Sequence, residues 1–245
     1  MVVRGAEYER RPMDDYSTPL YVLRAALSVF ELGRTVVDPC AGRGNVVRAL
    51  RGSGRRAFGY DVKRGFDFLT NDPPLRTSYD VFTNPPYGPG GRLALKFIIR
   101  ALEVTERWRS RVVFLLPVDF DSGRTRRVVF ADHPAFARKV VLLSRIRWFD
   151  NASGSTNHAW FEWDWKRAND RVPTIEYITG EIEDDADDRR SRNGRAPRRE
   201  PSPPPQSSGR RKVGDAAEQP PSDPPLQLAF GWGRSQDSVS EGDPR

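Results

Sequence analysis

Apolar residues recur at helical spacing in three segments of the chain, at positions 19–32, 44–50 and 93–107. In the first segment Leu20, Leu23 and Leu27 fall on one face, Pro19 stands at the first helical position, and Gly33 follows the last turn. The same spacing over the other two segments predicts a helix in each of them.

Short β-branched or continuously apolar runs lie between and after these segments. They occupy positions 35–37, 56–62, 79–83, 111–118, 139–143 and 159–165, and positions 124–130 are expected to form a short helix. Alternating strands and helices predict an α/β fold, a doubly wound, Rossmann-like parallel sheet with helices on both faces. Ligands of such sheets bind at the carboxyl ends of the strands.

The chain divides into two parts of different composition. Positions 1–180 contain the predicted elements and form the expected folded domain. Positions 181–245 alternate acidic and basic blocks, are rich in Pro and Ser, and contain few large apolar residues, so we expect a disordered tail. The tail holds 11 of the 40 Lys and Arg and 13 of the 33 Asp and Glu, which leaves the domain with a net charge of +9.

One short apolar island interrupts the tail. Within it, Gln227, Leu228, Ala229 and Phe230 loosely resemble the peptides that dock on replication sliding clamps. A replication partner is one interpretation of this island, and an apolar fragment without a function is the other.

Composition narrows the class of protein further. The single cysteine excludes an intramolecular disulfide, no apolar run is long enough to span a bilayer, and the N-terminal residues lack the apolar core of a signal peptide. We therefore expect a soluble, cytoplasmic protein. The basic domain fits a polyanionic partner, although many arginine-rich proteins simply have solvated basic faces.

A glycine-bearing loop follows the first predicted strand. In "DPCAGRG", Gly42 and Gly44 let a ligand approach the backbone at the start of the next helix. Asp61, about 20 residues further on, ends the following strand, where an acid accepts hydrogen bonds from ribose hydroxyls. The loop fits neither a dinucleotide fingerprint nor a phosphate-binding P-loop, so it indicates a nucleoside without phosphates. An ordinary turn with an incidental Asp61 is the alternative.

A second motif, "NPPY", follows the strand at 79–83. Its residues Asn84, Pro85, Pro86 and Tyr87 place an amide, a rigid carbonyl and an aromatic ring side by side. Such a group suits the recognition of a planar amine. A Pro-Pro turn capped by Asn84 is the structural alternative.

Together, "DPCAGRG" and "NPPY" resemble the S-adenosylmethionine-dependent methyltransferases that modify exocyclic amines, above all compact, phage-type DNA adenine-N6 methyltransferases. The resemblance covers roughly positions 14–165 and includes the upstream "YSTP", which these enzymes place beside the methionine end of the cofactor. It implies that S-adenosylmethionine is bound by Tyr16, Thr18, Pro19, Asp38, Pro39, Gly42, Gly44, Asp61, Val62, Asp67 and Phe68.

The resemblance also implies a nucleic-acid partner, most simply double-stranded DNA, and assigns the chemistry. The Asn84 side-chain oxygen and the Pro85 carbonyl would accept hydrogen bonds from the adenine amine, Pro86 would keep the turn rigid, and Tyr87 would stack on the base. Asp67 can accept from the cofactor's adenine amine, with Phe66 or Phe68 on the purine face. The same clamp would suit adenine in RNA, cytosine-N4 or a protein glutamine, and a non-catalytic nucleic-acid-binding protein on this fold is a further alternative.

Several other residues are candidates for lesser roles. Arg92, Lys96 and the loop at 119–127 are candidate phosphate ligands, although a solvated charge run explains them equally well. Cys40 is expected to be a small buried residue, and two histidines with one cysteine provide no metal-site spacing. The short stretch before Tyr79 indicates that the third strand of the usual seven-stranded sheet is reduced.

Overall fold

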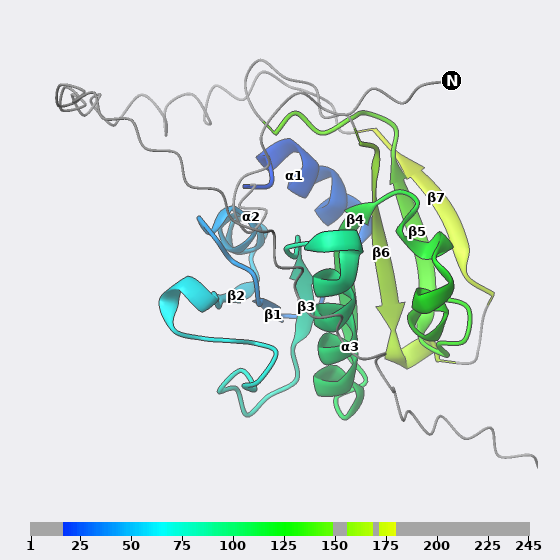
Figure 1. Cartoon of the computed structure of the whole chain (residues 1–245). Helices are drawn as coiled ribbons and strands as arrows, with labels where there is room; N and C mark the ends of the chain where they lie inside the picture. Colours follow the sequence, from blue (N-terminus) through cyan, green and yellow to red (C-terminus); the bar gives the residue numbers. More distant parts are fainter. Residues whose placement is uncertain (1–16, 149–155, 169–171, 180–245) are drawn as a thin grey trace, which may run out of the picture. The chain divides into compact units, whose positions relative to one another are not determined.

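The computed structural model describes residues 17–148, 156–168 and 172–179 (Figure 1). Tyr16, the predicted tail at 181–245 and the docking motif at 227–230 lie outside these residues. Within them, no helix is both long and apolar enough to cross a membrane.

A seven-stranded sheet forms the centre of the described domain, with the order β2-β1-β3-β4-β6-β5-β7. The strands are β1 (Thr35–Asp38), β2 (Arg56–Gly59), β3 (Asp80–Thr83), β4 (Arg111–Pro117), β5 (Phe136–Leu142), β6 (His158–Asp164) and β7 (Thr174–Ile178). β1, β2, β3 and β4 pair in parallel, so their carboxyl ends meet at one edge of the sheet. This edge carries the two sequence motifs.

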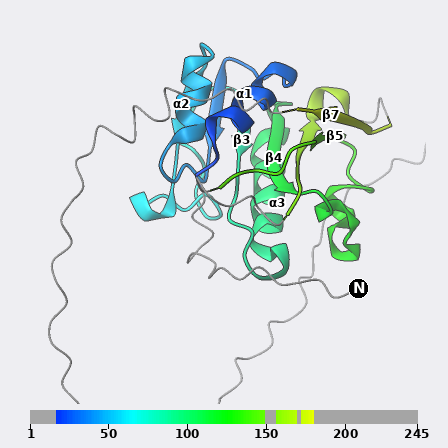
Figure 2. The ribbon, with the colours of Figure 1, turned by 90° about the horizontal axis from the view of Figure 1, so that it is seen from above.

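Helices cover both faces of the sheet, as predicted. They are α1 (Leu20–Val29), α2 (Asn45–Gly52) and α3 (Arg92–Glu106), and Figure 2 shows α1 and α2 on one side of the strands and α3 on the other. The buried strand β4 shows the consequence, because its side chains alternate between two apolar cores. Val112, Phe114 and Leu116 pack with α3, whereas Val113 and Leu115 pack with α1 and α2.

The strand β6 corrects the expectation of a parallel sheet. It runs antiparallel to both of its neighbours. Its Phe161 lies opposite Phe114 of β4, and its Trp160 lies opposite Val140 of β5. A parallel neighbour needs a crossover connection, usually a helix. The described residues between β5 and β6 contain no helix, and the strand returns in the opposite direction.

The edges of the sheet also differ from the expected arrangement. No strand lies between β2 and β3, where positions 60–79 form only the short 3₁₀ helix η2 (Val62–Arg64) and turns, so the third strand is absent rather than merely reduced. The count of seven is reached at the other edge by β7, which pairs in parallel with β5 and which the sequence pattern did not indicate. β2 is therefore an edge strand.

Two elements, α1 and β2, end three residues earlier than predicted. α1 ends at Val29 instead of Leu32, because Phe30 takes an extended conformation and packs its ring 6.3 Å from that of Trp160. Pro19 is the N-cap of this helix and not its first residue. β2 ends at Gly59, so Asp61 lies in the following loop, where it caps η2.

Candidate active site

A cleft opens at the carboxyl ends of β1, β2 and β3, with a volume of about 770 Å³ that includes the solvent at its mouth. The predicted site residues that line it are Thr18, Pro39, Gly42, Asp61, Val62, Asp67, Phe68, Asn84 and Pro86. Residues from four separate stretches of sequence thus meet in one cavity. The predicted residues Pro19, Asp38, Gly44, Pro85 and Tyr87 lie next to the lining residues in the chain but not among them.

The glycine loop and Asp61 form one side of the cleft. Gly42 and Gly44 both have positive φ, 46° and 83°, and Gly44 is the N-cap of α2. The backbone N–H of Gly42 donates to the Asp61 carboxylate at 2.8 Å, and the N–H of Lys63 donates to its other oxygen at 2.9 Å. The carboxylate is therefore held between two loops, and each oxygen retains a lone pair for a further donor.

Asp38 lies behind this loop at the end of β1. It is 1% exposed, and its Oδ1 accepts hydrogen bonds from the Thr83 hydroxyl at 2.7 Å and from the Cys40 N–H at 3.1 Å. Oδ2 is buried without a hydrogen-bond partner among the described residues. Burial raises the pKa of Asp38 from its ordinary 3.8 to about 7, against the opposing effect of the Thr83 hydrogen bond. The side chain joins the end of β1 to that of β3.

Aromatic and acidic side chains of positions 66–68 also line the cleft. The Phe66 ring lies 4.4 Å from the ring of Tyr60 and lines the cleft. Phe68 is 1% exposed and stacks 6.2 Å from Phe97 in the core. Of the two candidates, Phe66 is therefore the more accessible to a ligand. The Asp67 carboxylate lines the cleft and accepts from the Leu69 N–H at 2.9 Å.

The side chain of Asn84 is held by two hydroxyl groups. Its amide nitrogen donates to the Thr18 hydroxyl at 3.1 Å, and its amide oxygen accepts from the Tyr87 hydroxyl at 3.2 Å. The Tyr87 hydroxyl also lies 3.3 Å from the carbonyl oxygen of Leu115, a second acceptor for its single proton. These contacts fix the orientation of the amide, and its oxygen can accept one more hydrogen bond.

Tyr87 is directed toward the sheet. Its ring centroid lies 6.2 Å from that of His158, whose own ring lies 5.4 Å from Trp148. Burial lowers the pKa of His158 from 6.5 to about 4, so this ring is neutral at pH 7. Asn84 and Pro86 thus line the cleft, while Tyr87 packs between Asn84 and the sheet.

The segment after Tyr87 turns sharply before α3. Gly88, Gly90 and Gly91 have positive φ, and a Cβ on Gly91 would lie 2.8 Å from the Phe120 ring. Arg126 holds this turn by donating to the Gly90 carbonyl at 2.8 Å and to the Phe120 carbonyl at 2.7 Å. Among the candidate phosphate ligands, Arg126 therefore has a structural role, and Arg127 is paired with Asp132 at 2.8 Å. Arg92, Lys96 and Arg124 are exposed.

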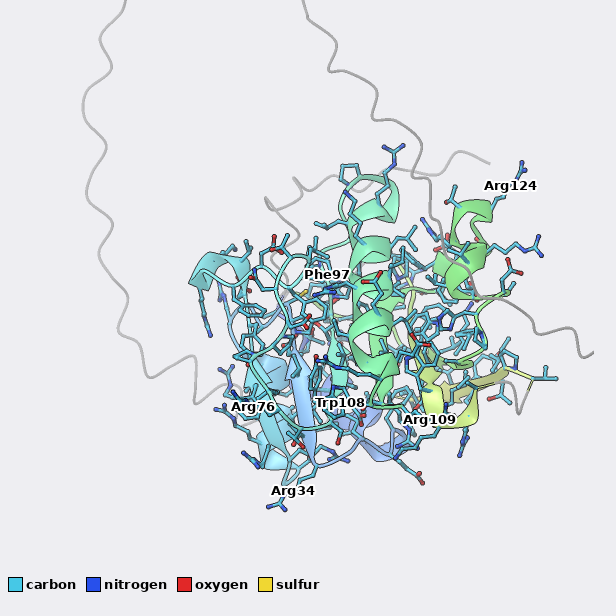
Figure 3. All side chains as sticks on the ribbon, turned by 90° about the horizontal axis from the view of Figure 1, so that it is seen from below. Arg34, Arg76, Phe97, Trp108, Arg109 and Arg124 are labelled. Carbon is cyan, nitrogen blue, oxygen red and sulfur yellow. The ribbon has the colours of Figure 1, made fainter. Side chains whose placement is uncertain are left out.

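The cleft includes residues that the sequence analysis did not assign. The Asn45 amide donates to the Thr18 carbonyl at 2.9 Å, which ties the start of α2 to the segment before α1. Arg43 and Lys63 also line the cleft. Phe97 of α3, labelled in Figure 3, lines it as well. Phe97 carried no signal, because its place on the apolar face of a helix resembles that of any core residue. Asn45 directly after Gly44 could have been taken as part of the glycine loop.

Cys40 is less buried than expected, and His133 lies in the interior. Cys40 lines the cleft and is half-buried, and burial raises the pKa of its thiol well above the ordinary value, which opposes a thiolate nucleophile. His133 is buried, and its Nδ1 accepts from the Ala135 N–H at 3.2 Å. No group of three metal-ligating side chains occurs among the residues that the structure describes.

Neither a protein-family model nor a curated protein matches the sequence. Solved structures with a similar fold include a type I restriction-modification methyltransferase subunit from Streptococcus thermophilus, at 17% identity and a TM-score of 0.46 over 67% of this chain and 47% of that one. A candidate class I S-adenosylmethionine-dependent methyltransferase from Listeria monocytogenes is 14% identical, with a TM-score of 0.45 over 71% of this chain and 67% of that one.

A candidate RNA methyltransferase from Pyrococcus horikoshii is likewise similar in fold, at 14% identity and a TM-score of 0.44 over 66% of this chain and 92% of that one. The chain spans just under half the length of the restriction-modification subunits that it matches. The strand order, the parallel pairing of β1 to β4 and the helices on both faces are themselves those of the Rossmann-like α/β sheet that the sequence predicts.

Proposed function

We propose that the chain is an S-adenosylmethionine-dependent methyltransferase that transfers a methyl group to the exocyclic N6 amine of adenine in DNA. One observation carries this proposal: Asn84 lines the same cleft as Gly42 and Asp61. A nucleoside-binding loop and an amide suited to a planar amine therefore share a single cavity.

The cleft has the hydrogen-bond acceptors and the aromatic ring that the cofactor requires. Asp61 offers acceptors for ribose hydroxyls, while Phe66 offers a ring face and Asp67 an acceptor for an adenine base. Thr18 and Asn45 would flank the methionine end. Bound there, the cofactor supplies a sulfonium-activated methyl group.

The residues of the chain then act on the acceptor amine. The lone pair of an adenine amine is delocalised into the ring, and the nitrogen must become more tetrahedral to attack. The Asn84 oxygen and the Pro85 carbonyl would accept hydrogen bonds from its two N–H groups and favour that geometry. Thr18 and Tyr87 hold the amide ready, so no reorganisation is needed when the base arrives. Alignment of the reacting atoms can supply roughly 7–11 kcal/mol of the barrier.

A duplex hides this amine inside the base stack. The target nucleotide of a DNA substrate must therefore be flipped out of the duplex, at a cost of a few kcal/mol. Stacking of the flipped base on an aromatic ring is worth about 1–3 kcal/mol and would offset part of this cost. Because Tyr87 packs between Asn84 and the sheet, its ring would have to turn toward the cleft to supply this stacking.

A panel of acceptors tests the proposal. The protein is incubated with S-adenosylmethionine carrying a labelled methyl group and, separately, duplex DNA, structured RNA and a protein extract, and the products are hydrolysed and analysed. Label in N6-methyladenine from DNA is the expected result. Label in RNA adenine, cytosine-N4 or glutamine alone would reassign the substrate, and cofactor binding without transfer to any acceptor would favour a non-catalytic binding protein.

A further inference from the structure

A dense group of arginines surrounds α2 and the edge strand β2. We call it the basic edge and define it as Arg43, Arg48, Arg51, Arg55, Arg56 and Arg64. Between positions 43 and 64 the only carboxylate is that of Asp61, which accepts the two backbone hydrogen bonds described above. The segment is therefore strongly positive for its size.

The charges of the basic edge are not compensated within the described structure. None of the six guanidinium groups forms a salt bridge with a described carboxylate. Their hydrogen-bond partners are neutral: Arg51 donates to the Ala57 carbonyl at 2.8 Å, Arg64 to the Gly42 carbonyl at 2.9 Å, and Arg55 to the Ser53 hydroxyl at 2.7 Å. Each guanidinium has five N–H donors, so most of them remain available.

Several cations elsewhere in the described domain do have acidic partners. Arg107 lies 3.9 Å from Asp72, Arg127 lies 2.8 Å from Asp132, and Arg167 lies 3.8 Å from Asp164. Arg111, Arg138 and Lys139 also have acidic partners. Lack of an acidic partner is therefore not a property of every described cation, although Arg92, Lys96 and Arg124 share it. The basic edge is distinguished by density, because six such arginines lie within positions 43–64.

The basic edge leads to the cleft. Arg56 begins β2, and its N–H donates to the Arg34 carbonyl at the amino end of the sheet, where Figure 3 shows Arg34 directed outward. At the carboxyl end of the sheet, Arg43 lines the cleft and Arg64 contacts Gly42. The four residues of β2 span about 13 Å, a length over which duplex DNA carries several phosphate charges.

We propose that the basic edge binds the phosphate backbone of the substrate nucleic acid outside the target nucleotide. This inference rests on the proposed nucleic-acid substrate and adds a surface that neither motif indicates. The planar guanidinium group of arginine matches the geometry of phosphate oxygens and is weakly hydrated, and we take the partner to be phosphate rather than carboxylate. Backbone contacts of this kind are independent of base sequence and give affinity that falls steeply with salt.

The test measures duplex binding by the full-length protein as a function of salt concentration. The variant Arg48→Gln/Arg55→Gln/Arg56→Gln removes three charges from residues outside the cleft. The matched control, Arg107→Gln/Arg127→Gln/Arg167→Gln, removes three charges that have acidic partners. Circular dichroism and binding of S-adenosylhomocysteine verify that each variant is folded with an intact cleft.

The basic-edge variant is expected to bind a 20-base-pair duplex about 10- to 100-fold more weakly in 100 mM salt, with the slope of log K against log salt reduced by about 2–3. The control is expected to change affinity less than about threefold. Equal losses in both variants, or an unchanged slope, would overturn the inference. So would vesicles of anionic lipid or an acidic peptide that lose affinity for the variant while the duplex does not. If the parent protein binds no nucleic acid at all, the proposed function fails as well.

Discussion

The Asn84 side chain donates a hydrogen bond at 3.1 Å to the hydroxyl of Thr18, a residue 66 positions earlier in the chain. This contact joins the segment before α1 to the turn after β3 across the cleft. It also orients the amide, whose oxygen accepts from Tyr87 and keeps a second lone pair for a ligand. The relation between these two residues explains how a flexible amide becomes an oriented acceptor.

The Tyr87 hydroxyl is expected to contribute to turnover through Asn84. Tyr87→Phe keeps the ring but removes the hydrogen bonds to the Asn84 oxygen and the Leu115 carbonyl. Because one such bond is worth about 1 kcal/mol, we expect kcat to fall roughly 3- to 10-fold with little change in KM. Tyr87→Ala, which also removes the ring, is the comparison and should raise KM in addition. Identical kinetics for wild type and Tyr87→Phe would contradict this role.

Asp61 is expected to control cofactor affinity. Asp61→Asn keeps the shape of the side chain but turns an amide NH₂ toward either the Gly42 N–H or the Lys63 N–H and removes an acceptor from the ligand. We expect the Kd for S-adenosylhomocysteine, measured by calorimetry, to rise about 10- to 100-fold, which corresponds to 1.4–2.8 kcal/mol. Asp72→Asn, an exposed acid outside the cleft, serves as the control and should leave Kd unchanged. An unaltered Kd for Asp61→Asn would remove Asp61 from the site.

The glycine turn before α3 is expected to tolerate no side chain. Gly91→Ala places a methyl group 2.8 Å from the Phe120 ring and 2.9 Å from the Arg126 guanidinium, at a residue with φ of 76°. Gly54→Ala is the matched control, since Gly54 has φ of 84° but open space around it. We expect Gly54→Ala to lower the free energy of unfolding by about 1–2 kcal/mol through backbone strain alone, and Gly91→Ala to lower it by more. Equal losses would show that the contact with Arg126 and Phe120 is unimportant.

Two buried histidines are expected to make the protein sensitive to acid. Burial lowers the pKa of His133 and of His158 from 6.5 to about 4, so the unfolded chain binds protons that the folded chain excludes. Their contribution is fully present above pH 6.5 and is lost as the pH falls toward 4. At pH 5 the loss is about 1–2 kcal/mol for each histidine.

Urea unfolding at pH 7.5 and pH 5 measures this effect. His158→Gln removes one titrating group, and the difference in unfolding free energy between the two pH values should shrink by about 1–2 kcal/mol relative to wild type. Asp38 acts in the opposite direction, since its raised pKa lowers stability as the pH rises from 3.8 to 7, but this term is common to both proteins. A pH dependence unchanged by His158→Gln would contradict the assignment of a buried, neutral ring.

Local sequence patterns predicted most of the elements because the burial of those elements leaves a periodic pattern of apolar residues in the sequence. α2 and α3 have one apolar face each, and β4 is buried on both sides, so their positions follow from periodicity alone. The end of α1 and the direction of β6 depend on tertiary contacts, such as the packing of Phe30 on Trp160, that no local window contains. β7 is short and mostly exposed, and its pairing with β5 is non-local.

The candidate site was predictable to the extent that it is built from contiguous motifs. Gly42 and Asn84 stand in short stretches with restricted conformations, and both line the cleft. The hydrogen bonds from the Asn84 amide to the Thr18 hydroxyl and from the Asn45 amide to the Thr18 carbonyl join distant segments and left no sequence signal. The same is true of Phe97, which enters the site from α3.

The central claim is that Asn84 grips a flat amine in the cleft that holds the cofactor. Its most direct test is methyl transfer to duplex DNA by wild type and Asn84→Ala, with S-adenosylhomocysteine binding measured on the same preparations. We predict N6-methyladenine from wild type, and for Asn84→Ala a loss of transfer of at least about 100-fold with a Kd within a few-fold of wild type. Transfer that survives in Asn84→Ala, or a variant that loses cofactor binding together with activity, would contradict the account.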